Sequence, residues 1–124
     1  MQIALYLSAV LCFGIGLAHS ILGERYILIR LFRRNDLPKL FGGQEFTVRT
    51  LRFAWHITTV AWWGFAGILI LIAEHALSSH NVLSVVATTF FVSAMITLVA
   101  SNGRHLAWPV FLVIAVASVY PIYI

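Results

Sequence analysis

The chain has 124 residues, of which 61% are hydrophobic and only 10% are charged. Its mean hydropathy is +0.96. A soluble domain of this size has too little interior to bury so much apolar surface, and an average soluble domain has about 25% charged residues. The same composition excludes intrinsic disorder. A single cysteine, Cys12, excludes a disulfide-linked secreted scaffold. We therefore expect an all-α integral membrane protein.

Stretches without Asp, Glu, Lys or Arg mark the expected membrane spans, because a helix needs roughly 20 apolar residues to cross a bilayer. They predict four transmembrane helices at residues 2–22, 52–73, 82–101 and 105–123. We expect these helices to form one domain, 1–124, with the architecture of a compact four-helix bundle. The first stretch is expected to be a retained helix rather than a cleaved signal peptide, because no basic residue precedes its apolar core.

The basic residues are distributed unevenly between the connections. Seven of the eight lie in or beside the long first connection, residues 24–51: Arg25, Arg30, Arg33, Arg34, Lys39, Arg49 and Arg52. The eighth, Arg104, lies between the third and fourth spans, and the second connection has none. Because basic loops stay in the cytoplasm, the pattern predicts that both termini face outward, in a bacterial-type inner membrane.

The first connection mixes apolar residues with arginines over residues 26–34. The arginines of this segment fall on one helical face, which predicts an interfacial amphipathic helix or a bent continuation of the first span. Pro38 is expected to end this helix, and Gly42 and Gly43 to form a turn. Anionic lipid headgroups are the expected partner of the arginines. No motif accompanies the charge, so we expect no nucleic-acid partner.

Small and polar residues are predicted to line the contacts between helices, because helices in lipid associate through close packing of small side chains. The stripe expected in the first span is Ser8, Cys12, Gly16, His19 and Gly23. The stripe expected in the third span is Thr89, Ser93, Thr97 and Ser101. Trp62 and Trp63, near the centre of the second span, are expected to donate their indole N–H groups to hydroxyls of the third span.

Three histidines are predicted to converge at the cytoplasmic leaflet. His19 lies five residues before Glu24, and His56 lies four residues after Arg52. At 1.5 Å per residue, both histidines lie about 6–8 Å inside the membrane boundary. His105 opens the fourth span at the same boundary. Polar groups inside a membrane are costly, so we treat these histidines as candidates for a functional site.

Three interpretations of the histidines remain open at this point. The first is a haem b held from opposite sides by His19 and His56. Its pocket would be lined by Gly16, Phe53, Trp55, Trp62 and Trp63. The second is a divalent metal bound by His19, His56 and His105, with Glu24 as a fourth ligand or a supporting group. The third is a set of structural hydrogen bonds. No local haem or zinc motif selects between them.

The sequence has few signs of catalysis or of ion coupling. No charged residue lies in the middle of a span, and no nucleophile–base pair or glycine-rich phosphate loop is present. We therefore expect a small binding or accessory membrane protein rather than an enzyme. Its expected partners are the lipid bilayer and either another copy of itself or a larger membrane complex. The alternatives are a passive channel or homo-oligomeric transporter lined by the Ser/Thr stripe, and a purely structural subunit.

Overall fold

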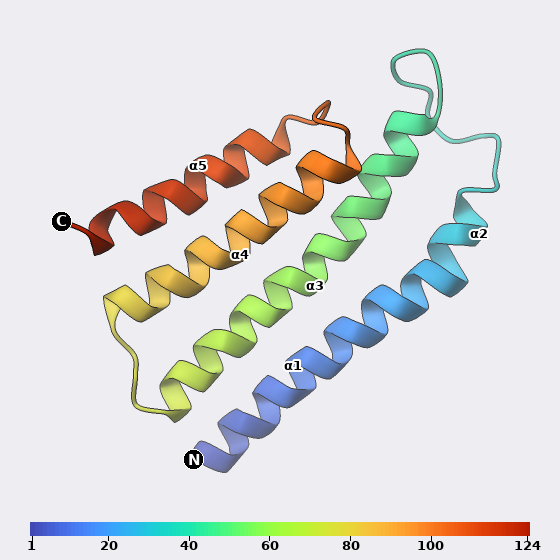
Figure 1. The fold of residues 1–124 in the computed structure, drawn as a ribbon. Coiled ribbons are helices and arrows are strands. Elements are labelled where there is room, and N and C mark those ends of the chain that lie inside the picture. The colour runs from blue at the N-terminus through green and yellow to red at the C-terminus, as the bar shows by residue number, and fades with distance from the viewer.

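The computed structural model describes all 124 residues and is helical, without β-strands. Its main helices are α1 (Gln2–Leu22), α3 (Glu45–Ala73), α4 (Ser79–Ala100) and α5 (Ala107–Val119). Helix α1 continues through the π-helical segment η1 (Gly23–Leu28) into α2 (Ile29–Leu31). The 3-10 turn η2 (Tyr120–Ile122) follows α5. The prediction of an all-α protein is confirmed. Figure 1 shows the four main helices side by side in an antiparallel row.

Three helices are long and apolar enough to cross a membrane: Gln2–Leu31, Glu45–Ala73 and Ser79–Ala100. This result supports a membrane protein. The prediction of a fourth full span at 105–123 is not confirmed, because α5 has only 13 residues. At 1.5 Å per residue it is about 20 Å long, whereas the hydrocarbon core is about 30 Å thick. The two ends of the expected span are not α-helical, because a turn precedes Ala107 and a 3-10 turn contains Pro121.

The helices pack in chain order rather than as a closed bundle. The first packs against α3, α3 against α4, and α4 against α5, and no extended packing joins α1 to α5. The compact bundle expected from the sequence is therefore not formed within one chain. A row leaves large apolar side chains exposed on its faces. Lipid tails solvate such side chains as well as a protein interior does, so a bilayer removes the usual driving force for closing the bundle.

Small residues recur every seven positions along the contact lines of the row. The buried sets are Ala9, Gly16 and Gly23; Thr59, Ala66 and Ala73; and Ala87, Ala94 and Ser101. A repeat of seven keeps the same helical face against its neighbour when two helices wind around each other with a left-handed twist. The contact stripe predicted for the first helix is confirmed at Gly16 and Gly23, which are buried. It is wrong at Ser8, which is exposed.

The hydroxyl stripe of α4 lies inside the helix contacts, as the sequence predicts. Ser93, Thr97 and Ser101 are all buried. The Ser93 hydroxyl donates to the Thr89 carbonyl at 2.8 Å, and the Ser101 hydroxyl accepts from the His105 amide at 3.3 Å. The hydroxyls of Ser93 and Ser101 thus contact the protein backbone, whereas the buried Thr97 hydroxyl has no hydrogen-bond partner.

The connection from Phe32 to Gln44 contains the expected turn at Gly42 and Gly43, but the helix before it ends at Leu31, earlier than the break predicted at Pro38. Leu40 and Gly43 exchange two backbone hydrogen bonds of 2.9 and 3.3 Å. Gly42 has φ +88°, a left-handed conformation that glycine adopts without strain. Arg34 donates to Asp36 at 2.8 Å, and this hydrogen bond holds the pKa of the Asp36 carboxyl below its usual value. The preceding arginine segment begins as a continuation of the first helix, and its position along a membrane surface stays a prediction.

Candidate functional site

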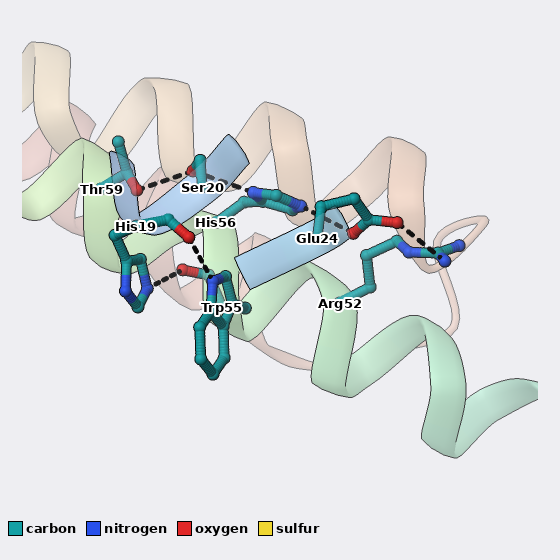
Figure 2. A network of polar contacts seen from close by, with 7 residues as sticks. All are labelled: His19, Ser20, Glu24, Arg52, Trp55, His56 and Thr59. Carbon is teal, nitrogen blue, oxygen red and sulfur yellow. Dashed lines mark hydrogen bonds and ion pairs between the residues drawn. The ribbon is translucent and has the colours of Figure 1, made fainter. Parts of the chain in front are cut away.

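Polar and aromatic side chains gather between α1 and α3, near the end of the row that carries the long connection (Figure 2). We call this group the polar seam. Its members are His19, Ser20, Glu24, Arg52, Trp55, His56 and Thr59. Most of the other buried positions along the helix contacts are small residues. The polar seam is therefore a specialised part of the first helix contact.

Helical spacing brings the two sides of the polar seam into register. Ser20 and Glu24 are four residues apart, as are Arg52 and His56, so each pair lies on one face of its helix. The third helix begins at Glu45, seven residues before the predicted start of the span, which places Arg52 inside a continuous helix. Glu24 lies in the π-helical segment. A π turn inserts an extra residue into a helix and often occurs at functional sites.

A chain of hydroxyl groups crosses from one helix to the other. The Thr59 hydroxyl donates to the Gly16 carbonyl at 3.1 Å. The hydroxyl oxygens of Ser20 and Thr59 are 2.7 Å apart, and His56 Nδ1 is 3.0 Å from the Ser20 oxygen. These groups lie in a row in Figure 2. The chain fixes the imidazole of His56 against α1.

Charged groups continue the chain toward the end of the row. His56 Nε2 is 3.3 Å from Glu24 Oε2, and Glu24 Oε1 is 3.0 Å from Arg52 Nη2. The Arg52 guanidinium lies 4.9 Å from the centre of the Phe32 ring, within cation–π range. The side chains of Glu24 and His56 are each 30% exposed. The partial burial of Glu24 makes its ion pair with Arg52 stronger than a fully solvated one.

The Glu24 carboxylate fixes the role of one His56 nitrogen. A carboxylate only accepts hydrogen bonds, so His56 Nε2 is the donor in its contact with Glu24. The Ser20 hydroxyl can donate to His56 Nδ1 or accept from it, because either Ser20 or Thr59 can supply the hydrogen of the bond between them. Both ring nitrogens therefore have hydrogen-bond partners within the protein.

His19 is held by a reciprocal clasp with Trp55. The Trp55 indole donates to the His19 carbonyl at 2.9 Å, and His19 Nε2 donates to the Trp55 carbonyl at 3.2 Å. The two rings stack with centroids 4.4 Å apart and planes 3° apart. Gly23 makes this arrangement possible, because a Cβ at its position would overlap the indole.

The structure brings His19 and His56 to the same helix contact but gives them different partners, as Figure 2 shows. The haem interpretation needs a free nitrogen on each imidazole, and His56 uses both in hydrogen bonds. His105 lies elsewhere, stacked on Phe46 at 5.7 Å and edge-on to Phe53 at 4.9 Å. No group of three or more His, Cys, Asp or Glu side chains is arranged to hold a metal. The set of His19, His56, His105 and Glu24 is thus not assembled.

The sequence reasoning missed several members of the polar seam. It did not single out Ser20 or Thr59, although the i,i+4 spacing of Ser20 and Glu24 was a readable signal. It also misplaced the partner of Trp63, whose indole donates to the Phe13 carbonyl at 3.4 Å rather than to a hydroxyl of α4. Trp62 instead lies tilted against His19, with ring centroids 4.9 Å apart.

Comparison with known proteins adds no family relationship. No family model, no curated protein and no solved structure matches the chain. The residues of the polar seam are therefore the basis for inferring a function.

Proposed function

We propose that this chain is a membrane-embedded binding protein without catalytic chemistry of its own, and that its site lies at the polar seam. One observation carries the proposal: seven polar and aromatic side chains gather at one helix contact in a chain with only 10% charged residues. Polar groups that are withdrawn from water are costly, and in membrane proteins they mark functional sites by default.

The geometry separates the two histidines into different tasks. His56, bonded at both nitrogens, joins the helices. His19 donates only through Nε2, so in its neutral form the other nitrogen keeps a lone pair that can accept from a ligand. We therefore propose binding through His19, and we do not retain haem ligation by both histidines or a three-histidine metal site.

A structural subunit of a larger membrane complex is the second candidate. The observation that favours it is the open row, which leaves large apolar side chains exposed on several helices, such as Phe65 at 63% and Val113 at 67%. Helices of another membrane protein, or of a second copy, would cover these side chains. A passive channel has less support, because the hydroxyls of Ser93 and Ser101 in the stripe contact the backbone.

We also propose that the protein lies in a cell inner membrane, with the arginine-rich connection in the cytoplasm and in contact with anionic lipid. The support is that Arg104 and the long basic connection lie at the same end of the row, whereas both termini lie at the other (Figure 1). A C-terminal alkaline phosphatase fusion should be active, and a C-terminal green fluorescent protein fusion should be dark. The reverse pattern would overturn the orientation.

The binding function is tested by asking what the purified protein carries. Native mass spectrometry of the full chain in mild detergent, with an absorption spectrum and metal analysis, should show a retained organic compound without a haem Soret band. The His19→Ala variant should lose that compound, and the matched control His80→Ala, in an exposed histidine far from the polar seam, should keep it. Identical mass spectra for all three proteins would overturn the binding function and leave the structural subunit.

A further inference from the structure

A groove of about 420 Å³ opens beside the polar seam, on the surface shared by α1, η1 and α3. Its lining is mostly apolar and aromatic and includes His19, Leu22, Gly23, Tyr26, Trp55 and Trp62. No Asp, Glu, Lys or Arg side chain lines it. Such a groove favours a neutral ligand with a large apolar surface.

One residue of the groove lining, His19, carries a hydrogen-bond acceptor that is held in a fixed position. The His19 ring is held in place by the stacked Trp55 indole, by the tilted Trp62 indole and by its bond to the Trp55 carbonyl. Because Nε2 carries the hydrogen of that bond, Nδ1 keeps its lone pair, and it has no partner within the protein. A rigid acceptor among aromatic rings is pre-organised to receive a donor from a ligand.

We propose that the groove binds a lipid-soluble hydroquinone, an aromatic ring with hydroxyl groups and an apolar tail, whose hydroxyl donates to His19 Nδ1. The proposal rests on the binding function proposed above and names the ligand class for that site. The proposal concerns binding of the hydroquinone alone and includes no redox step.

The chemistry of the groove favours this class over ordinary membrane lipids. A diacyl phospholipid presents ester carbonyls, and these acceptors cannot bond to the acceptor nitrogen of His19. Diacylglycerol has a hydroxyl, but its acyl chains lack an aromatic face to pack on Trp55 and Trp62. A hydroquinone supplies both the donor and the ring.

The test is a binding titration of the full chain in lipid nanodiscs, kept anaerobic, with tryptophan fluorescence as the signal. The probe is decyl-hydroquinone, and its di-O-methyl ether is the control ligand, because the ether keeps the ring and tail but has no hydroxyl hydrogen. We expect saturable quenching by the hydroquinone and at least about tenfold weaker binding of the ether, the loss expected for one hydrogen bond to a fixed acceptor.

Two variants locate the site. His19→Phe keeps a ring stacked on Trp55 but removes the acceptor, and it should weaken hydroquinone binding by about tenfold or more. Ala18→Leu should block the groove while leaving the bonds of His19 in place, so it keeps the test valid if His19→Phe fails to fold. The control His80→Ala should bind normally.

The outcomes separate the ligand class from the binding function. Equal affinity for the hydroquinone and its ether, or unchanged binding by Ala18→Leu, would overturn the hydroquinone proposal. Competition by diacylglycerol with no response to the hydroquinone would also overturn it. In each case a compound retained by the wild type and lost in His19→Ala, seen by native mass spectrometry, would show that the binding function stands with a different ligand.

Discussion

Gly23→Ala is expected to destabilise the fold by about 1–3 kcal/mol, the usual cost of forcing a methyl group into a well-packed contact. The new Cβ would overlap Nε1, Cε2 and Cζ2 of the Trp55 indole. The indole cannot easily move away, because it stacks on His19 and donates to the His19 carbonyl. The thermal midpoint of the variant in detergent should therefore fall.

Gly14→Ala is the matched control on the same helix. A Cβ at Gly14 meets no atom within 4 Å. Alanine is favoured over glycine in a helix by up to about 1 kcal/mol, so this variant should be as stable as the wild type or slightly more stable. Similar losses in the two variants would mean that the close contact between Gly23 and Trp55 does not hold α1 against α3.

Glu24→Gln is expected to cost about 1–2 kcal/mol of unfolding free energy, since it removes a charge that pairs with Arg52 and accepts from His56 in a partly buried position. Arg52 Nη2 and His56 Nε2 both contact the Glu24 carboxylate, at 3.0 and 3.3 Å. Without the negative charge, the Arg52 guanidinium loses its ion pair, and the His56 N–H faces a neutral amide. Chemical or thermal unfolding in nanodiscs measures the loss.

The control for this prediction is Glu45→Gln. Glu45 pairs with Arg49 at 2.7 Å, but its side chain is 69% exposed. An exposed pair at this helical spacing contributes only about 0.3–0.5 kcal/mol. If Glu45→Gln is as harmful as Glu24→Gln, the stability of the protein depends on net charge rather than on the polar seam.

The sequence predicts the helices well because long apolar stretches without charged residues mark them. Gaps without charged residues locate the first three helices, and α3 ends at Ala73 as predicted, although α3 begins seven residues early and the first helix continues to Leu31. The row could not be predicted, because the seven-residue repeat of small residues is hidden among many other apolar residues. Gly16 and Gly23 were recognised as contact positions, but Ala9 looks like any other apolar residue until its neighbours are known.

The candidate site was predicted only in part, because the sequence gives the position of a residue along its helix but not the direction of its side chain. Depth along a helix can be counted from the sequence, so His19, His56 and Glu24 were correctly placed at one end of the row. The direction of each imidazole depends on rotation about the helix axis and on the π turn at Gly23–Leu28. Neither has a distinct sequence signal. His105 was grouped with the other histidines because its depth is similar, although it packs on Phe46 and Phe53.

The division of tasks between the two histidines is the central claim, and the protonation of their ring nitrogens tests it most directly. The measurement is ¹⁵N NMR of histidine-labelled protein in nanodiscs at neutral pH, with His19→Phe and His56→Gln spectra to assign the signals. We expect an N–H at Nε2 of both histidines, facing the Trp55 carbonyl from His19 and the Glu24 carboxylate from His56, and a bare Nδ1 on His19. A bare Nε2 on either histidine, or hydrogen on both nitrogens of His19, would contradict the hydrogen-bond arrangement on which the binding site depends.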